Sequence, residues 1–463
     1  MQGIPALLAQ AAALFAGAGS PLYLVGGWPR NRLLNLPGGD FDVCSALPGP
    51  QAAALFAQTP GVRAVDRSTA LGTLSVVGPG FEAEYTAFRA ESYGPSGAHR
   101  PETVTFGVPM EQDALRRDFT VNALYYDIAA GQLADPLGGL ADLERRILRT
   151  CRPPQQTFDD DGLRLMRLVR LGGELGFAPE EGTFAAARDR AALIGDIAPE
   201  RIRGELERLL LCDVKYPGND PGAVLGALHA VDALGLLQRI LPELDACRGV
   251  GQRRDYHDYD VLEHCLHACA AAPALLELRL AALLHDVGKP AALAAGGRMV
   301  GHDKLGEELA RQALERLRFS NAVISEVCAL VRAHMVDLDS RMGAGKLRWF
   351  FVELGRERTR KLMDLRRADV SGSRAQPPSA DPAAKWAALL ERMEREGVPW
   401  TQAQLDIDGE ALSALAGGPS PRVGALKRAL HRHAALRPAD NNRRRLISLA
   451  EQLIRQWDKE GKV

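Results

Sequence analysis

The sequence lacks several features that would assign it to a specialised class of protein. No apolar run approaches the ~20 residues that a membrane-spanning helix needs, and the seven scattered cysteines include no CxxC pair. The formal net charge is only -1, from 57 basic and 58 acidic side chains, so the chain has no general basic coat for nucleic acid. We therefore expect a cytoplasmic protein with reduced thiols and no membrane partner, in which any RNA site is a local patch.

What is present is the composition of an ordinary globular protein. Hydrophobic residues make up 46% and charged residues 25% of the chain, which excludes wholesale disorder. A chain of 463 residues is too long for one compact core, and three or more domains are expected. The apolar stretch over residues 4–15 has no basic flank before it, and it predicts an amphipathic helix rather than a signal peptide.

The strongest chemical pattern lies in residues 23–43. A short apolar strand is predicted to end at Gly26 and Gly27, a short helix follows, and Asp40 and Asp42 lie on the next predicted strand. Glycines let a phosphate approach the backbone closely, and two carboxylates two residues apart share one face of a strand. Such a pair suits Mg²⁺ ions in nucleotidyl transfer. Either pattern alone also fits an ordinary turn before an exposed strand end.

More charged residues follow within the first 150 residues. Residues 81–88 alternate apolar and polar, so Glu84 is either a third carboxylate beside the aspartate pair or a plain exposed strand charge. A loop is expected over residues 90–109. Arg117 and Asp118 then stand in an Arg-Arg-Asp cluster directly before an apolar run. Arginines can clamp triphosphate oxygens, and an aspartate can orient an arginine or the sugar.

Residues 157–177 predict one long helix. Arg164, Arg167 and Arg170 recur every third residue, and the stripe alone would fit a solvated helix face. Asp161 and Arg164 are three residues apart and are expected to share a face. A carboxylate accepts hydrogen bonds and a guanidinium donates them, which matches the amino donor beside a ring-nitrogen acceptor in cytosine and adenine. Uracil and guanine present donor and acceptor in the opposite order, and each mismatched group would cost roughly 1–3 kcal/mol of binding free energy.

A second set of metal-binding residue types lies between residues 255 and 370. An adjacent histidine and aspartate occur in an apolar segment, and further histidines precede and follow them. Imidazoles and carboxylates that hold paired divalent ions would activate water against a phosphate ester. A transition metal is among the candidates. The order of His264, His285, Asp286, His302, His334 and Asp369 resembles the set that binds two metals in some HD phosphohydrolases, and this resemblance implies these six residues as the ligands.

The order of these motifs resembles that of a known family. The glycine pair, an arginine and the two aspartates are similar to the signature of class II tRNA nucleotidyltransferases and bacterial poly(A) polymerases, at Gly26, Gly27, Arg30, Asp40 and Asp42. The run RRDFTxNA, which ends in Asn122 and Ala123, resembles the same family. Asn31 stands where the family usually has aspartate, and Asp160 replaces glutamate in its EDxxR motif. The adjacent His285 and Asp286 resemble the HD phosphohydrolases.

The resemblance implies an α+β architecture with four parts. These are a polymerase-β-like nucleotidyltransferase head with a mixed sheet, a helical neck that selects the base, a helical HD body and a helical tail that binds tRNA, over residues 1–150, 151–213, 214–390 and 391–463. The implied catalytic and Mg²⁺-binding residues are Asp40, Asp42 and Glu84. The implied nucleotide-binding residues are Gly26, Gly27, Arg30, Arg117, Asp118, Asn122, Asp161, Arg164, Arg167 and Arg170.

The reaction implied by the resemblance is template-independent addition of C and/or A nucleotides to the 3′ end of tRNA from CTP and ATP. An A-adding enzyme, a CC-adding enzyme and a poly(A) polymerase share this chemistry and stay open. An alternative of another class is an HD phosphohydrolase whose head binds RNA and is a weak catalyst. The HD body is expected to hydrolyse phosphate esters such as those of RNA ends. Homodimer formation is also left open.

Overall fold

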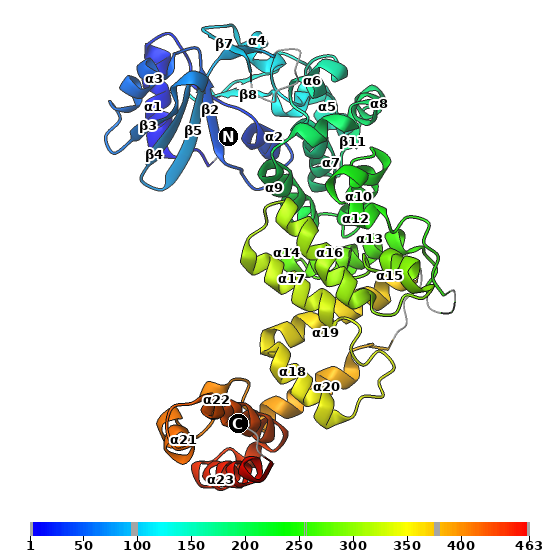
Figure 1. Ribbon diagram of the computed structural model, residues 1–463. Coiled ribbons are helices and arrows are strands. Elements are labelled where there is room, and N and C mark those ends of the chain that lie inside the picture. The colour runs from blue at the N-terminus through cyan, green and yellow to red at the C-terminus, as the bar shows by residue number, and fades with distance from the viewer. Residues whose placement is uncertain (1–2, 94–100, 254, 256, 375–379, 461–463) are drawn as a thin grey trace. The chain divides into compact units, whose positions relative to one another are not determined.

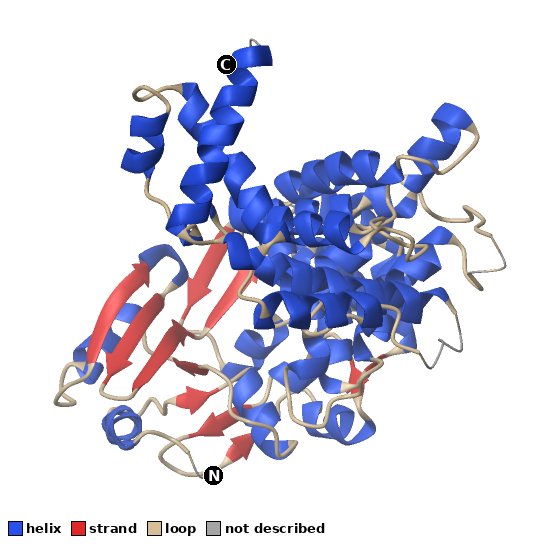
Figure 2. Cartoon of the chain, turned by 90° about the horizontal axis from the view of Figure 1, so that it is seen from below, coloured by secondary structure: helices blue, strands red, loops and turns tan. Residues whose placement is uncertain are grey.

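The computed structural model describes residues 3–93, 101–253, 255, 257–374 and 380–460. The chain forms two compact units, Met1–Asp245 with Arg316–Phe319, and Ala246–Glu315 with Ser320–Val463. Every strand of the described residues lies in the first unit, whereas the second unit is built of helices. Figure 2 shows the strands in red and the helices in blue. The first unit contains the expected head and neck. No helix in the described parts of the chain is long and apolar enough to cross a membrane.

The head is built on a mixed seven-stranded sheet, as expected (Figure 1). Its strands lie in the order β3 (Arg63–Ser68), β4 (Thr73–Gly78), β5 (Phe81–Ala87), β2 (Phe41–Ser45), β1 (Tyr23–Leu24), β8 (Tyr125–Asp127) and β9 (Leu133–Ala134). Neighbouring strands are antiparallel except β2 and β5, which are parallel. The alternation expected in β5 is confirmed, because its odd-numbered residues are buried and Glu82 and Glu84 are exposed.

Five helices complete the head: α1 (Ala6–Gly17), α2 (Gly27–Leu33), α3 (Gly49–Phe56), α4 (Met110–Leu115) and α5 (Gly139–Arg145). The expected N-terminal helix is confirmed, and it buries Phe15 against Phe56 and Tyr85 in the main core of the head. The expected loop over residues 90–109 is wrong in part. Two strands, β6 (Arg89–Ser92) and β7 (Thr103–Phe106), pair antiparallel within this range. Residues 94–100 of the expected loop lie outside the described residues.

The neck contains four main helices and part of a small parallel sheet. The helices are α6 (Pro154–Asp160), α7 (Leu163–Leu175), α8 (Glu181–Asp189) and α9 (Pro199–Leu209), and the strands are β10 (Ile147–Leu148) and β11 (Ala178–Pro179). The neck is therefore mostly helical, as expected, with the two-residue strand β11 added. The first unit continues through α10 (Ala223–Ala233), α11 (Leu237–Ile240) and α12 (Pro242–Asp245).

The single helix expected over residues 157–177 is broken between α6 and α7. Asp161 is extended, with φ of -151° and ψ of 104°, and its Oδ1 accepts from the N–H of Leu163 at 3.1 Å. A Cβ on Gly162 would lie 2.8 Å from the carbonyl oxygen of Leu193, so the bend packs closely against a neighbouring turn. Aspartate competes for backbone donors and favours helix starts over helix interiors.

The second unit is helical throughout its described residues. Its first part contains α13 (Val261–Ala271), α14 (Leu276–Leu284), α15 (Lys289–Gly296), α16 (His302–Arg316), α17 (Asn321–Ala333), α18 (Ala344–Leu354), α19 (Arg356–Ser373) and α20 (Ala384–Arg395). The last part contains α21 (Gly409–Leu415), α22 (Pro421–Leu436) and α23 (Arg443–Glu460) around its own apolar cluster. All seven cysteines of the chain are buried and free of disulfides.

Candidate functional site

The first candidate site is an acidic edge of the head sheet. Asp42 on β2 and Glu84 on β5 are direct partners in the parallel strand pair, and both side chains are exposed. Asp40 lies one residue before β2, so the expectation that both aspartates lie on the strand is wrong by one residue. The N–H of Asp42 donates to the carbonyl of Asp40 at 3.2 Å, which closes the backbone into a turn. The register of β2 against β5 therefore places Glu84 beside Asp42, where it could act as the third carboxylate of the acidic edge.

The negative charge of Asp42 is unfavourable in these surroundings. The pKa of Asp42 is raised to about 6, mainly by desolvation and to a smaller extent by repulsion from Glu84, although the side chain reaches solvent. Arg117 and Arg167 oppose this shift, and Asp40 adds to it. Carboxylates that repel one another at neutral pH are stabilised by a cation with oxygen ligands. The donor set at this edge therefore fits a divalent ion.

A glycine turn lies against the acidic edge. The N–H of Val25 donates to the carbonyl of Asp42 at 3.0 Å, so β1 ends beside β2. Gly26 has a φ of 76°, and a Cβ at this position would lie 3.3 Å from Oδ2 of Asp42. The left-handed backbone and the close approach both favour glycine. A Cβ on Gly27 would lie 3.4 Å from Nη2 of Arg30, so a carboxylate and a guanidinium flank the turn.

Arg30 and Asn31 are buried beneath this turn. Oδ1 of Asn31 accepts from Nε and Nη2 of Arg30 at 3.1 and 2.9 Å, and Nη1 of Arg30 donates to Oδ1 of Asn122 at 2.5 Å. Nδ2 of Asn122 in turn donates to Oδ1 of Asp118 at 3.0 Å. The guanidinium of Arg30 is thus held by two amide oxygens and is not open to solvent. Direct contact of Arg30 with a nucleotide would require the turn to move.

Asp118 joins this network to the neck. Nε and Nη2 of Arg167 both donate to Oδ2 of Asp118, the former at 2.8 Å. Burial disfavours the charge of Asp118, but the Arg167 charge and the hydrogen bonds of Asn122 and Arg167 outweigh it and hold the pKa of Asp118 well below its usual range. Asp118 is therefore an anion that fixes an arginine, which is one of the two roles expected from the sequence.

Asp113 is a buried carboxylate that the sequence analysis missed. It accepts hydrogen bonds from Nε of Arg116 at 2.9 Å, from Nη2 of Arg117 at 3.0 Å and from the hydroxyl of Tyr125 at 2.7 Å. Burial favours its neutral form, but Arg117 and Arg116 hold the pKa of Asp113 below its usual range. Its spacing of three and four residues before the two arginines, on one helix turn, is the sequence signal that could have found it.

The structure does not pair Asp161 with Arg164 as expected. Nη2 of Arg201 donates to Oδ2 of Asp161 at 2.8 Å. The guanidinium of Arg164 donates to the main-chain carbonyls of Thr157 at 3.1 Å and Arg116 at 2.5 Å. The N–H of Arg164 donates to the carbonyl of Asp161 at 3.0 Å, but within the described residues no side-chain hydrogen bond joins the two. The helix break between α6 and α7 is the cause, because it removes the shared helix face.

Two other neck residues are held inside the neck. Arg170 is buried, and its Nε and Nη1 donate to Glu205 at 2.5 Å and to Glu174 at 2.7 Å, which ties α7 to α9. Asp160, the residue that replaces glutamate, forms an ion pair with Arg152 and lies 3.8 Å from Nη1 of Arg164. Arg170 was expected to bind nucleotide, but its donors are satisfied by carboxylates of the neck itself.

The second candidate site lies in the second unit and contains all six expected metal ligands. The ligand atoms form two groups, each with atoms within 4.8 Å of one another: His264, His285 and Asp369, and Asp286, His302 and His334. All but Asp369 are buried. Across the residues that the structure describes, no other set of three such side chains meets this limit, and the carboxylates of the head sheet do not form one.

Asp286 lies between the two groups. Its Oδ1 is 3.2 Å from Nε2 of His302 and 3.6 Å from Nε2 of His334. Its Oδ2 is 3.2 Å from Nε2 of His285 and 3.4 Å from Nε2 of His264. A carboxylate with one oxygen toward each group is suited to bridge two ions.

The backbone fixes which nitrogen each imidazole presents. Nδ1 of His285, His302 and His334 lies 2.6–2.7 Å from the carbonyl oxygen three residues earlier. A carbonyl only accepts, so Nδ1 carries the proton and Nε2 of the neutral ring has a free lone pair. Nε2 of His302 and Nε2 of His334 face each other at 3.1 Å. Two lone pairs at this distance repel unless a cation lies between them, so the residues fit a metal centre.

The cluster also favours positive charge. Burial lowers the pKa of His285, but the carboxylates of Asp286 and Asp369 outweigh burial and raise the pKa of His285 to about 10. Lys289, which the sequence analysis did not single out, lies with Nζ 2.5 Å from Oδ2 of Asp286 and from Oε1 of Gln252. Its spacing of three residues after Asp286 is the signal that could have found it.

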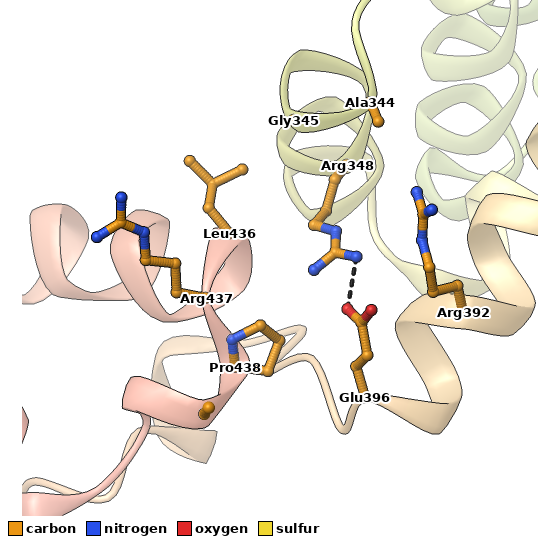
Figure 3. A pocket seen from close by; sticks show the side chains of 9 residues that line it. Ala344, Gly345, Arg348, Arg392, Glu396, Leu436, Arg437 and Pro438 are labelled. Carbon is orange, nitrogen blue, oxygen red and sulfur yellow. Dashed lines mark ion pairs between the residues drawn. The ribbon is translucent and has the colours of Figure 1, made fainter.

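An arginine-lined pocket of about 580 Å³ lies elsewhere in the second unit. It is formed by the start of α18, the end of α20 and the turn after α22 (Figure 3). Figure 3 shows Arg348 directed at Glu396, with Arg392 on the same side and Arg437 on the opposite wall. Nη2 of Arg348 is 2.5 Å from Oε2 of Glu396, and the lining residues include three arginines but only one carboxylate. The lining therefore carries a net positive charge.

Comparison with protein families gives three matches. Residues 22–149 match the poly A polymerase head domain, residues 176–218 match a probable RNA and SrmB-binding site of polymerase A, and residues 254–371 match the HD domain. The first of these ranges contains the acidic edge and the glycine turn. The last contains all six residues of the histidine and aspartate cluster.

Several curated proteins are similar over long segments. The A-adding tRNA nucleotidyltransferase of Deinococcus radiodurans is 38% identical over 347 residues, which cover 71% of this chain and 76% of that protein. The multifunctional CCA protein of Xanthomonas axonopodis pv. citri is 36% identical over 310 residues, 64% of this chain and 70% of that protein. The match to the CCA-adding enzyme of Limosilactobacillus fermentum, 39% identical, spans 42% of this chain and about half of that relative, 47%.

Solved structures agree with the expected α+β fold. The crystal structure of the Bacillus stearothermophilus CCA-adding enzyme in complex with CTP matches with a TM-score of 0.72 at 25% identity, over 99% of this chain and 100% of that one. A structure of a CCA-adding enzyme with ATP matches with a TM-score of 0.61 at 15% identity, over 96% and 95%, and supports the fold alone. With a relative 38% identical over most of both chains, this protein belongs to the tRNA nucleotidyltransferase and poly(A) polymerase family and carries an HD domain.

Proposed function

We propose that this protein adds C and/or A nucleotides to the 3′ end of tRNA, from CTP and ATP and without a template. The observation that carries the proposal is the cross-strand pair of Asp42 and Glu84 beside the close approach of Gly26, with the charges of Arg117 and Arg167 acting on Asp42. The names of the relatives, A-adding and CCA-adding, agree with this chemistry.

Asp40, Asp42 and Glu84 would hold Mg²⁺ in the head. Bound Mg²⁺ would activate the RNA 3′-hydroxyl and neutralise charge on the leaving group. In the reaction, the 3′ oxygen forms a bond to the α-phosphorus, the bond from that phosphorus to the bridging oxygen breaks, and pyrophosphate leaves. Arg117, held in place by Asp113, is suited to bind triphosphate oxygens, because its fork of donors is already oriented.

Base choice is proposed to depend on Asp161 and Arg164. To read a base, Asp161 must share or release Arg201, and Arg164 must leave its two main-chain carbonyls. Hydrogen bonds of a charged group contribute ~1.5–3 kcal/mol each, so the nucleotide must replace the bonds that are given up. C and A offer the matching donor and acceptor, and U and G do not. We expect Arg167 to support this site through Asp118 rather than to read the base.

The test uses purified protein and three tRNA substrates, which end before CC, before A, and after CCA. Each is incubated with CTP, ATP, UTP or GTP separately. We expect extension with CTP, ATP or both, and none with UTP or GTP. The pattern separates the CCA-adding, CC-adding and A-adding alternatives, and long A tails would indicate a poly(A) polymerase. Absence of extension with every substrate would contradict the proposal.

A second activity, hydrolysis of phosphate esters by the HD body, is favoured by the paired ligand groups around Asp286. The substrates we propose are RNA or nucleotide ends that carry a terminal or cyclic phosphate. The assay measures phosphate release or ring opening with Mg²⁺, Mn²⁺, Ni²⁺ and Co²⁺ added separately to metal-free protein. Hydrolysis without any nucleotide addition would favour the alternative of an HD phosphohydrolase with a weak head. No hydrolysis with any of the four metals would contradict the second activity.

We also propose the four-part division of roles stated above, with tRNA phosphates bound by the last two parts. The net positive pocket around Arg348 supports this. Arg392→Glu combined with Arg437→Glu should weaken tRNA binding and flatten its salt dependence, because fewer counterions are released. Arg395→Glu is the matched control, since Arg395 lies on the same helix as Arg392 but outside the pocket lining. Equal weakening in both variants would contradict a role for the pocket.

A further inference from the structure

Asn31, at a position where the family usually has aspartate, uses every hydrogen-bonding group of its side chain. Its side chain is 1% exposed. Oδ1 accepts two bonds from Arg30, and Nδ2 donates to the carbonyl of Pro37 at 3.1 Å and to the hydroxyl of Tyr216 at 3.2 Å. An aspartate could accept from Arg30 in the same way, but it could not donate to Pro37. The acceptors around Nδ2 therefore explain why an amide, rather than a carboxylate, fits at position 31.

The first of these contacts fixes the segment that leads to Asp40. The carbonyl of Pro37 accepts from Nδ2 of Asn31, and the N–H of Leu36 donates to the main-chain carbonyl of Asn31 at 2.8 Å. These two bonds anchor the segment between α2 and β2 three residues before Asp40. Pro37 and Asp40 themselves are exposed, so little other packing holds this segment.

The second contact reaches the neck region. The hydroxyl of Tyr216 is the acceptor, and Tyr216 is 6% exposed. Residue 216 follows α9 in the chain and falls within the range that matches an RNA-binding site of polymerase A. One buried amide therefore joins α2, the approach to Asp40 and the segment after α9.

The charges around Asn31 explain why a neutral side chain fits. In the described part of the chain, Arg30 has no carboxylate partner, whereas Arg170 has two, Glu174 and Glu205. With the pair of Asp118 and Arg167, this buried region holds three arginines and three carboxylates. An aspartate at position 31 would add a fourth carboxylate, and it would place an oxygen against the oxygen of Pro37 at about the present 3.1 Å.

We propose that Asn31 is a positioning residue for the metal-binding carboxylates of the head: by donating to Pro37, it fixes the backbone that presents Asp40 beside Asp42. The inference rests on the proposed Mg²⁺ site of the nucleotidyltransferase. It goes beyond that proposal because it assigns the alignment of the site to a residue that contacts neither ion nor nucleotide.

The test measures Mn²⁺ binding by electron paramagnetic resonance, independently of catalysis. Asn31→Asp keeps the acceptor for Arg30, adds a negative charge and loses the bond to Pro37. The Mn²⁺ that the wild-type protein binds and the Asp42→Ala variant does not is assigned to the head site. We expect Asn31→Asp to weaken Mn²⁺ at the head site ~10-fold, as loss of residues that orient metal ligands does. The Mg²⁺ concentration for half-maximal tRNA extension should rise in parallel, with little change in KM for nucleotide at saturating Mg²⁺.

Two control variants separate alignment from general loss of stability. Tyr216→Phe removes only the second acceptor of Nδ2, and it should leave Mn²⁺ affinity unchanged. Asn219→Asp is a matched substitution, because Nδ2 of Asn219 also donates to two main-chain carbonyls, those of Glu174 and Cys212. It should lower the unfolding temperature without changing Mn²⁺ affinity.

A third variant covers the case in which Asn31→Asp does not fold. Pro37→Gly changes an exposed residue and loosens the same segment through backbone entropy, so it should also weaken Mn²⁺ binding at the head. Unchanged or tighter Mn²⁺ binding in the folded Asn31→Asp variant or in Pro37→Gly, or an equal loss in Asn219→Asp, would overturn the inference. Failure of the proposed function looks different, since the wild-type protein would then bind Mn²⁺ through Asp42 without extending tRNA.

Discussion

Arg167 of α7 donates through Nε to Oδ2 of Asp118 at 2.8 Å, and this ion pair joins the neck to the arginine-rich segment of the head. The charge of Arg167 also lowers the pKa of Asp42, against the effects of burial and Glu84. The same guanidinium therefore acts on the helix proposed for base choice and on the acidic edge proposed for chemistry. Substitutions at this pair should alter both.

The first prediction concerns Asp118→Asn, which keeps the shape of the side chain and removes its charge. It leaves Arg167 without its carboxylate and should destabilise the protein by about 2–3 kcal/mol. We expect kcat/KM for nucleotide addition to fall by ~10–100-fold, a loss of about 1.4–2.7 kcal/mol in transition-state binding. Thermal unfolding and single-nucleotide extension at a temperature where the variant is folded measure the two effects.

Asp142→Asn is the control for this prediction. Asp142 is also a buried carboxylate of the head, and it accepts from Arg149 and from the hydroxyl of Thr120. It should lower stability and leave the rate of extension nearly unchanged. If both substitutions slow extension equally, the pair of Asp118 and Arg167 has no special part in the reaction.

The second prediction concerns the acidic edge. Asp40→Ala combined with Asp42→Ala should abolish incorporation of CTP and ATP, by at least ~1000-fold, because charge stabilisation by bound ions is worth several kcal/mol. Hydrolysis by the HD body should persist in the same protein. Glu82→Ala is the matched control, since Glu82 lies on β5 with Glu84, but its carboxylate pairs with Arg67 and accepts from the hydroxyl of Ser75. Activity that survives the double substitution would reject the proposed nucleotidyltransferase.

The third prediction is a pH dependence of metal binding. The pKa of Asp42 is raised to about 6, so below this pH protons compete with Mg²⁺ for its carboxylate. The apparent dissociation constant of Mg²⁺ should rise by up to ~10-fold per pH unit below about pH 6 and level off above about pH 7. Calorimetric titration with Mg²⁺ between pH 5 and pH 8 checks this.

The same shift has a defined sign for stability without metal. The folded protein holds the Asp42 proton more tightly than the unfolded chain, in which aspartate has its ordinary pKa of 3.8, so this group favours folding at low pH. Its contribution is lost as the pH rises through the window from 3.8 to about 6. In the Mg²⁺ titration, an apparent affinity that is flat between pH 5 and pH 7 would contradict the raised pKa.

The fourth prediction concerns removal of metal from the HD body. Asp286→Asn should reduce the amount of divalent metal that the protein binds and abolish phosphate-ester hydrolysis, because one side chain lies between both ligand groups. Extraction with a chelator should have the same effect and should be reversed by added metal. His267→Ala is the control, since His267 lies outside both groups, against Glu263 and Tyr259. Equal metal loss in the control would contradict the assignment.

Much of the fold could be predicted from local patterns. The alternation of β5 specifies a half-buried strand, and the helices of the second unit follow from long apolar periodicities. The HD ligands could also be predicted, because the order of the histidines and aspartates resembles that of the HD phosphohydrolases. What could not be predicted is how distant segments pair. Nothing local indicates that β2 pairs in parallel with β5, and this pairing places Glu84 beside Asp42.

The failures in the neck have a specific cause. Helix periodicity continues through residues 157–177, but Asp161 and Gly162 interrupt it, because aspartate accepts from the start of α7 and glycine permits close contact with Leu193. The partners of buried charges were also missed. Asp113 and Lys289 carry no motif of their own, and their importance comes from the side chains that fold around them.

The burial of all seven cysteines has a practical consequence. The folded protein presents no native thiol to maleimide reagents, so a cysteine introduced on the surface would be the one that reacts. Fluorophore pairs, one in the head and one in the last helices, could then report movements of the two units during nucleotide addition by energy transfer. No native cysteine would have to be replaced first.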